Sequence, residues 1–399
     1  MLNISVVAQR VPYPPNKGEK LRTFHQIERL VQLGYSVDVL TLVESPADES
    51  HAKALEAALN ITVSTFTLPA KPMRYLWAFR KGLPLSVGAF YSESLFHAII
   101  KKMTHEADVL LFSASSLGYY ALRGLKKVQC NAHLLMDFMD VDSDKWAQYA
   151  TSSVFPMSWI YTRESEKVQA LEAQINHTFL QTFLIAQEEV ALFHRKVSAE
   201  KPVKVLGNGM DFSHFYPAVD NHVNQPPNFL FTGVMDYKPN IDAVCWFVEH
   251  CWTPIKSKLP NATFTIAGMN PTDQVKALGD VDGVEVTGFV EDILPYFHRA
   301  CAFVAPFRIA RGVQNKVLQA TACNLVVVTT PMGAEGIAFA SPETMLMASD
   351  AKTFAEQCVK AVVDEANARV IAENAFHCIR QQYSWEQQLM PLQTLLESL

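Results

Sequence analysis

Short runs of apolar and β-branched residues alternate along this chain with segments whose apolar residues recur at helical spacing, and this alternation constrains the fold most. Residues 3–9, NISVVAQ, are followed by the helix-period segment 21–34, LRTFHQIERLVQLG, and by a second run at 35–43, YSVDVLTLV. A strand, a helix and another strand in succession form the repeating unit of a parallel sheet covered by helices. Further runs of the same kind lie at residues 61–68, 107–115, 133–139 and 182–187. The pattern therefore predicts an α/β fold.

The alternation breaks once, in a loop-rich stretch between residues 200 and 228. This stretch carries Pro217, Pro226 and Pro227, and the alternation starts again after it. A chain of 399 residues with 49% apolar residues is too long for one ordinary core and can fill two. We therefore predict two doubly wound, Rossmann-like domains facing a central cleft, where ligands meet the carboxyl ends of the strands. The expected domains are residues 1–207 and residues 208–379, with residues 380–399 packing back on the first.

The composition narrows the functional class. A net charge of −6 and a pI near 6.1 argue against nucleic acid as a partner. The seven cysteines form no CxxC pair and sit mostly in apolar runs, which favours reduced thiols in a cytosolic protein. The N-terminus is apolar over too short a span for a signal peptide, and no run approaches the ~18 apolar residues of a membrane span. We expect a cytoplasmic protein that is at most peripheral at the inner face of the cytoplasmic membrane.

The strongest candidate for a functional site is the stretch 306–322, PFRIARGVQNKVLQATA. Arg308, Arg311 and Lys316 surround Gly312 where a loop enters a predicted helix, and no acidic residue lies among them. A structural ion pair explains one such cation, but it explains three less easily. A diphosphate explains all three, because cations at a helix entrance suit a phosphate group.

Three other strand-end loops of the second half carry weaker signals. Gly233 lies just past a predicted strand, with Lys238 and Asn240 before a helix. This arrangement lets the backbone approach an anion closely, but it also fits an ordinary turn with an asparagine cap. Gly268 ends another strand, and Val290 follows a third, where its backbone groups could meet a planar base or simply form a turn.

In the first half, Lys17 and Gly18 lie in the loop after the first strand and face the same cleft in the predicted topology. Asp140 and Asp142 stand in an acidic cluster, MDFMDVDSDKW, that lacks the central glycine and terminal glutamate of an EF-hand. We therefore predict no metal site. We expect Asp140 or Asp142 to contact substrate hydroxyls or to cap the next helix.

Residues 71–83 differ from the strand-end loops described above, because they contain four cations and no acid. The cations are Lys71, Arg74, Arg80 and Lys81. Leu76 and Phe79 fall on one helical face, Arg74 falls on the opposite face, and Trp77 lies toward the edge. This pattern is typical of an interfacial helix on anionic lipid, with Leu76, Trp77 and Phe79 in contact with the bilayer and the four cations drawn to its headgroups. A solvated amphipathic helix packed on its own sheet fits the same pattern.

Taken together, these motifs resemble a known family. NGMDFSHFYP, FTGVMDYKPNIDAVCWF, FTIAGMNP, VEVTGFVEDILPYF and VAPFRIARGVQNKVLQA are similar to the family-4-type glycosyltransferases of GT-B fold. PYPPNKGEKLRTFH, DFMDVDSDKWAQYA and RGVQNKVL more narrowly resemble the sugar transferases of PEP-CTERM/exosortase exopolysaccharide systems. The resemblance covers almost the whole chain. It implies transfer from a UDP- or GDP-linked donor to a lipid-linked saccharide, with retention of configuration and with no cofactor or obligatory metal.

The resemblance also implies roles for single residues. Lys17 and Gly18 match a loop near the donor phosphates and the acceptor. The basic residues that match those holding the pyrophosphate are Lys238, Arg308 and Lys316. The family's paired glutamates fall on Arg311 and Gln319; the arginine is usual for the narrower group, whereas a glutamate is expected at position 319.

Two other functions fit parts of the sequence. A nucleotide-sugar epimerase of GT-B fold would need acid/base carboxylates or histidines in the cleft. A non-catalytic nucleotide-binding assembly partner is suggested by Gln319. An amide can still hydrogen-bond a ribose diol, so we expect donor binding weaker by about 1–2 kcal/mol rather than lost chemistry. Because the cations that would stabilise the leaving diphosphate are present, we favour a working enzyme.

Overall fold

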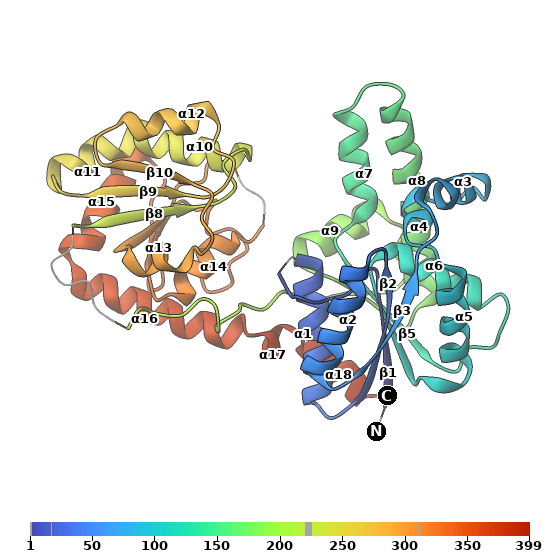
Figure 1. Cartoon of the computed structure of the whole chain (residues 1–399). Helices are drawn as coiled ribbons and strands as arrows, with labels where there is room; N and C mark the ends of the chain where they lie inside the picture. Colours follow the sequence, from blue (N-terminus) through green and yellow to red (C-terminus); the bar gives the residue numbers. More distant parts are fainter. Residues whose placement is uncertain (1, 17, 220–225, 310–311) are drawn as a thin grey trace. The chain divides into compact units, whose positions relative to one another are not determined.

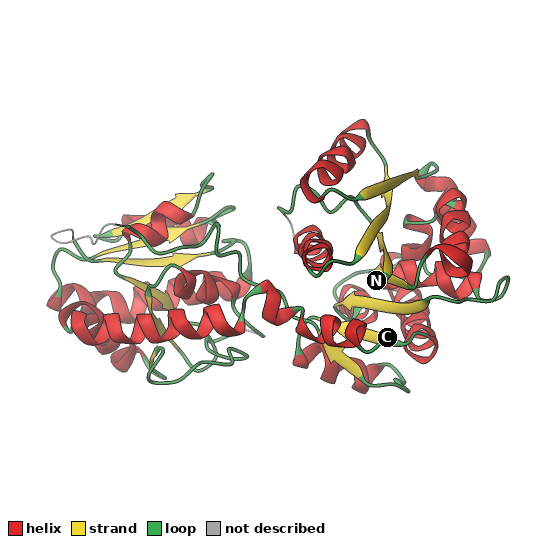
Figure 2. Ribbon diagram, turned by 90° about the horizontal axis from the view of Figure 1, so that it is seen from below, coloured by secondary structure: helices red, strands yellow, loops and turns green. Residues whose placement is uncertain are grey.

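The computed structural model describes residues 2–16, 18–219, 226–309 and 312–399. It divides into two compact units, one formed by residues 1–208 with 388–399 and the other by residues 209–387. Each unit is built around one parallel sheet with helices on both of its faces (Figures 1 and 2). The predicted α/β class is confirmed.

The first unit holds a seven-stranded sheet in the order β3-β2-β1-β4-β5-β6-β7, in which every pairing is parallel. Its strands are β1 (Asn3–Ala8), β2 (Ser36–Val43), β3 (Thr62–Thr67), β4 (Val109–Ser113), β5 (His133–Met139), β6 (Gln181–Leu184) and β7 (Val203–Val205). Its helices are α1 (Gly18–Gln32), α2 (Pro46–Leu59), α3 (Lys71–Arg80), α4 (Leu85–Ala89), α5 (Glu93–Lys101), the π-helix η1 (Lys102–Glu106), α6 (Ser115–Gly124), α7 (Asp142–Thr151), α8 (Met157–Thr178), α9 (Gln187–Lys196) and α18 (Met390–Glu397).

The second unit holds a six-stranded parallel sheet in the order β10-β9-β8-β11-β12-β13. Its strands are β8 (Asn228–Thr232), β9 (Thr263–Ala267), β10 (Val284–Gly288), β11 (Ala302–Ala305), β12 (Val326–Thr329) and β13 (Leu346–Met347). Its helices are α10 (Lys238–Trp246), the π-helix η2 (Phe247–Trp252), α11 (Thr253–Lys258), α12 (Asp273–Lys276), the 3₁₀-helix η3 (Ala277–Asp280), α13 (Leu294–Arg299), α14 (Asn315–Ala322), α15 (Ala351–Val363), α16 (Glu365–Gln382) and α17 (Trp385–Gln388), whose last residue belongs to the first unit.

The order of the strands places the ligand-binding edge of each sheet. Successive strands are added toward one edge of the sheet up to β3 and toward the other edge from β4 on, so the strand order reverses between β1 and β4 in the first unit. In the second unit it reverses between β8 and β11. Helices leave opposite faces at such a point, so a crevice opens at the carboxyl ends of the two strands. In strand β1, Ile4, Val6 and Val7 are at most 1% exposed, because helices cover both faces of the sheet. This burial explains why the sequence of the strand is a continuous apolar run.

Two elements differ from the sequence prediction. Strand β7 lies within the stretch that the sequence presents as loop, where three residues give little periodicity. The helix predicted after Asn240 is interrupted by the π-helical turn η2, just ahead of Pro254. The C-terminal helix α18 lies beside α1, where Arg29 Nη2 donates to Gln393 Oε1 at 3.1 Å (Figure 1).

Candidate functional site

Two glycines bring strand-end loops into contact at the carboxyl edge of the second sheet. Gly268 follows β9 with a φ of 150°, and a Cβ atom there would lie 1.7 Å from the carbonyl oxygen of Gly233. Gly233 follows β8, and its N–H donates to Ala267 O at 3.0 Å. A side chain at position 268 would therefore push the two loops apart, and a Cβ atom at Gly233 would lie 2.6 Å from Asn240 Nδ2, so both positions favour glycine.

Lys316 is the central polar group at this edge. It lies in the first turn of α14, and its Nζ donates to Asn240 Oδ1 at 2.5 Å. Its ammonium group also lies 4.9 Å from the ring centre of Phe231 and 5.0 Å from that of Phe307. A Cβ atom added to Gly233 would lie 3.0 Å from Lys316 Nζ, so the glycine leaves the ammonium group open to the loop.

Among the residues that the structure describes, no carboxylate balances the charge of Lys316. No acidic side chain in the described part of the chain lies within ion-pair distance of its Nζ. Burial lowers the pKa of Lys316 from 10.5 to about 8. A half-buried ammonium group at a helix N-terminus and at the reversal point of a parallel sheet has the charge and the position of a candidate anion site.

Asn240 holds Lys316 in place. Its side-chain Nδ2 donates to Val234 O at 2.8 Å, while its Oδ1 accepts from Lys316. Asn240 is buried and lies inside α10, so it connects the β8 loop to α14. The sequence offered Asn240 as a helix cap; it does not cap α10, whose N-cap residue is Tyr237.

Arg308 is partnered by an acid that the sequence argument did not consider. Its guanidinium group forms a double ion pair with Asp242 of α10, at 3.1 Å from Nε to Oδ2 and 2.5 Å from Nη2 to Oδ1. The premise that no acid accompanies the three cations is therefore wrong for Arg308, because the partner comes from 66 residues away in the chain. Its side chain is 49% exposed, so the pair lies at the surface.

The remaining residues predicted on the donor side lie around the same edge. Gly312 has a φ of 65°, a conformation that favours glycine, and Gln319 lies on α14 three residues after Lys316, half-buried. Lys238 is the exposed first residue of α10, and Val290 is half-buried after β10. Arg311 lies outside the described residues.

The first unit has a small hollow at the equivalent edge of its sheet. Its lining residues are Gln9, Arg10, Glu19, Lys20, Thr23, Ser113, Ala114 and Met139. Ala114 has a φ of 105° and Met139 a φ of 68°, although neither is a glycine. Residues held in such sparsely populated conformations gather at functional sites, so this backbone marks the hollow as a candidate for binding. Gly18, predicted to act here, is the exposed first residue of α1; Lys17 lies outside the described residues.

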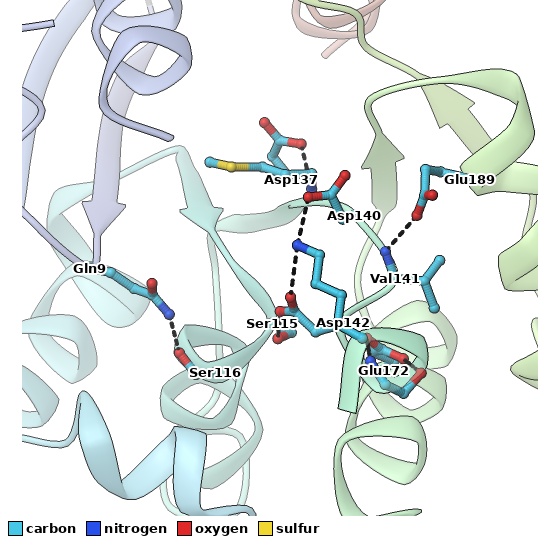
Figure 3. A network of polar contacts seen from close by, with 12 residues as sticks. Gln9, Ser115, Ser116, Asp137, Asp140, Val141, Asp142, Glu172 and Glu189 are labelled. Atoms are coloured by element: carbon cyan, nitrogen blue, oxygen red, sulfur yellow. Dashed lines mark hydrogen bonds and ion pairs between the residues drawn. The ribbon is translucent and has the colours of Figure 1, made fainter. Parts of the chain in front are cut away.

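The acidic cluster after β5 is occupied by contacts within the protein. Asp140 pairs with Lys145 at 2.6 Å, and Asp142 Oδ2 accepts a hydrogen bond from Ser115 Oγ at 2.6 Å (Figure 3). Burial raises the pKa of Asp142. Asp142 is the first residue of α7, and its side chain reaches toward α6. Asp140, at 40% exposure, is the more accessible of the two carboxylates.

A buried ion pair beneath this cluster escaped the sequence argument. Arg22 of α1 forms two contacts with Asp137 of β5, at 2.6 Å and 2.9 Å, and both side chains are at most 1% exposed. Gln26 Nε2 also donates to Asp137, at 2.6 Å. The only signal in the sequence is an arginine and a glutamine four apart on an otherwise apolar helical face. The pair fixes α1 to β5 at the edge that carries the hollow.

Residues 71–83 form α3 and the turn after it, but two of the predicted contacts are wrong. Arg74 is buried, where it pairs with Glu44 at 2.8 Å. Trp77 stacks on Tyr91 with a centroid distance of 4.1 Å. Both therefore pack α3 onto its own unit, because they point to the side of the helix opposite Leu76 and Phe79. Arg80 and Lys81 are exposed, as is Lys71.

Two features are absent from the described residues. No group of three or more histidine, cysteine, aspartate or glutamate side chains is arranged to hold a metal ion. No helix within those residues combines the length and the hydropathy needed to cross a membrane.

Comparison with known proteins relates the second unit to a described family and the whole chain to one relative. Residues 226–364, all within the second unit, match the family described as glycosyl transferases group 1. The whole chain is 24% identical over 400 residues to a protein of Klebsiella pneumoniae described as an uncharacterized 44.6 kDa protein in the cps region, covering 96% of this chain and 97% of that protein.

Two solved structures show the same fold. Sucrose-phosphate synthase from Thermosynechococcus elongatus has a TM-score of 0.65 at 18% identity, covering 100% of this chain and 99% of that one. HepE from Anabaena, solved in complex with UDP, has a TM-score of 0.66 at 14% identity over 100% of both chains. The predicted GT-B fold is confirmed. The family match supports the broader resemblance to glycosyltransferases, while the narrower resemblance to PEP-CTERM/exosortase systems stays a prediction.

Proposed function

We propose that this chain is a glycosyltransferase that moves a sugar from a nucleoside-diphosphate donor, UDP- or GDP-linked, to a saccharide acceptor. The observation that supports this most directly is Lys316, whose half-buried ammonium group has no carboxylate partner among the described residues. A diphosphate would supply the missing negative charge. The match of residues 226–364 to glycosyl transferases group 1 includes this lysine.

The proposed chemistry uses Lys316 at the leaving group. When the bond between the sugar and the donor breaks, negative charge grows on the diphosphate, and a cation already in position stabilises that charge. Asn240 keeps the ammonium group directed at the loop after β8, so little reorganisation is needed. Arg308 and Arg311 are proposed as further cations near the diphosphate; Arg308 would have to share its guanidinium group with Asp242. Lys17, Gly18 and Lys238 complete the proposed donor contacts.

The finer parts of the proposal concern stereochemistry and acceptor. We propose retention of configuration with no obligatory metal or cofactor, since protein cations would neutralise the leaving group. The acceptor is proposed to be a lipid-linked saccharide in exopolysaccharide biosynthesis at the cytoplasmic face of the membrane, reached in part through residues 71–83. The relative from a cps region supports polysaccharide biosynthesis. Asp140 is the better candidate for contacting an acceptor hydroxyl, because Asp142 is engaged by Ser115.

A panel of nucleotide sugars tests this proposal. The melting temperature of the full chain is measured with UDP- and GDP-linked sugars, and each sugar that raises it is then incubated with the protein to detect release of the nucleoside diphosphate. We expect one base to be preferred and its sugar donor to be hydrolysed slowly in the absence of acceptor. Stabilisation without any release of diphosphate would favour a non-catalytic nucleotide-binding partner. Conversion of the bound sugar to an epimer would favour an epimerase.

A further inference from the structure

The first unit exposes large apolar side chains in two places. At the turn between α7 and α8, Val154 is 83% exposed, Phe155 is 81% exposed, and Trp159 is 54% exposed. On α3, Met73, Leu76 and Phe79 are 51–69% exposed and lie on one helical face. Apolar residues scattered singly need no explanation, but groups of this size on neighbouring elements mark an interaction surface.

The two groups are joined through α8. The guanidinium group of Arg163 lies 5.1 Å from the ring centre of Phe79, and its Nη2 donates to Leu83 O at 3.1 Å. Trp159 precedes Arg163 by one helical turn and so lies on the same face of α8, toward the turn that carries Phe155. An exposed strip, apolar except for Arg163, therefore runs from α3 along α8 to the end of the α7–α8 hairpin, which projects beyond the helices around it (Figure 1).

The hairpin is built to stay rigid with this strip exposed. Trp146 of α7 packs against Tyr149 and against Tyr161 of α8, with ring centres 5.6–5.8 Å apart. At its base, Glu172 of α8 accepts hydrogen bonds from Ser143 of α7, at 3.2 Å to the backbone N–H and 2.6 Å to the hydroxyl. Aromatic contacts and a buried carboxylate thus fix the two helices together. The turn that joins them stays exposed to solvent.

The charges around the strip match an anionic surface. No acidic residue occurs between Asp144 and Glu164, or between Lys71 and Ser92. Arg80 and Lys81 lie exposed at the end of α3, and neither forms an ion pair with another described residue. The acid that reaches α3 is Glu44, which is paired with the buried Arg74. Exposed phenylalanine followed by arginine and lysine on α3, with tryptophan on the hairpin, suits the boundary between lipid headgroups and acyl chains.

We propose that the end of the α7–α8 hairpin and the exposed face of α3 form one two-part docking surface for an anionic phospholipid bilayer. Val154, Phe155 and Trp159 enter the headgroup region, and Arg80 and Lys81 contact anionic headgroups. The hairpin is the new element: the sequence pointed only to residues 71–83, and two of the contacts expected there pack inward instead. This surface lies in the first unit and does not depend on the proposed sugar transfer.

Vesicle binding tests the surface. The full chain is sedimented with phosphatidylcholine vesicles containing about 30% phosphatidylglycerol and with vesicles of phosphatidylcholine alone. Val154→Ser with Phe155→Ser should lower partitioning onto the anionic vesicles about tenfold or more, because two large apolar side chains are removed. Arg80→Gln with Lys81→Gln should abolish the preference for anionic vesicles. Val363→Ser, at a 71% exposed position of α15 in the second unit, is the matched control and should bind like the wild type.

The fluorescence of Trp159 reports where the hairpin lies. The difference between the wild type and Trp159→Phe isolates its emission, which should shift to the blue and be quenched by brominated lipid when vesicles are added. The proposal is overturned if the hairpin variant partitions like the wild type, or if Trp159 stays accessible to an aqueous quencher on vesicles. It is also overturned if the wild type does not bind vesicles and instead dimerises through Val154, Phe155 and Trp159. Nucleotide binding, measured in the same variants, should be unchanged, which separates this result from the proposed activity.

Discussion

Single residues at the carboxyl edge of the second sheet carry most of the proposed chemistry, and Lys316 is the clearest of them. Its environment is unfavourable for a charge, since burial lowers its pKa to about 8 and no carboxylate of the described residues compensates it. Protein cores rarely keep an uncompensated cation unless it has a use. A diphosphate ligand would restore the balance and raise the pKa again.

The pH dependence of binding follows from that pKa. In the free protein Lys316 loses its proton near pH 8, whereas bound diphosphate holds the proton to a higher pH. Binding therefore takes up a proton above pH 8, and the dissociation constant for UDP or GDP should be lowest near pH 7 and rise up to about tenfold per pH unit above 8. Calorimetry across this range measures it. Lys316→Arg, which stays charged, should lose the dependence; an equal dependence in both proteins would contradict the assignment.

Gln319 offers a second test at the scale of a residue. It lies three residues after Lys316 on α14, where the family resemblance leads us to expect a glutamate. Gln319→Glu should keep donor affinity or improve it by up to about 1–2 kcal/mol, because a carboxylate accepts a stronger hydrogen bond from a ribose hydroxyl. Titration with the donor identified by the panel measures the change. A folded variant that no longer transfers sugar would show that glutamine has a role of its own.

At the scale of elements, the site depends on how closely the loops after β8 and β9 approach. A Cβ atom at Gly268 would overlap the carbonyl oxygen of Gly233, and its φ of 150° already disfavours a side chain. Gly268→Ala should therefore destabilise the second unit by about 2 kcal/mol or more and displace the β8 loop from Lys316.

Gly279→Ala is the matched control for this change. The nearest atom to a Cβ atom at Gly279 is 3.8 Å away, so the substitution should be close to neutral. Thermal melting of both variants, with and without nucleoside diphosphate, measures the difference. Equal melting temperatures for the two alanine variants would contradict the close approach of the loops.

On the scale of the whole molecule, the sequence predicted what depends on local pattern. Alternating strand and helix signals, as in residues 3–9 and 21–34, arise from side-chain period and burial, and these gave the α/β architecture correctly. Glycines at strand ends were also recognised, because a parallel sheet gathers its carboxyl ends at one edge.

The sequence did not reveal which residues far apart in the chain form ion pairs. The partner of Arg308 is Asp242, and that of Arg22 is Asp137, so only the folded chain reveals which cations are already neutralised. The contact of Arg74 was predicted wrongly for the same reason. A helical wheel separates the two faces of a helix, but it does not show that Glu44 lies beside one of them. The positive φ angles of Ala114 and Met139 have no sequence signal at all.

The central claim is that Lys316 binds the diphosphate of a nucleotide sugar, and one calorimetric comparison tests it most directly. The wild type and Lys316→Met are titrated at pH 7 with UDP and GDP and with the matching free nucleosides. The variant removes the donor to Asn240 Oδ1 as well as the charge, so the melting temperature of the ligand-free variant is measured alongside to show that lost binding does not reflect unfolding. We expect the variant to bind the preferred diphosphate about tenfold or more weakly while its affinity for the nucleoside is unchanged. Equal losses for diphosphate and nucleoside, or no loss for either, would contradict the account.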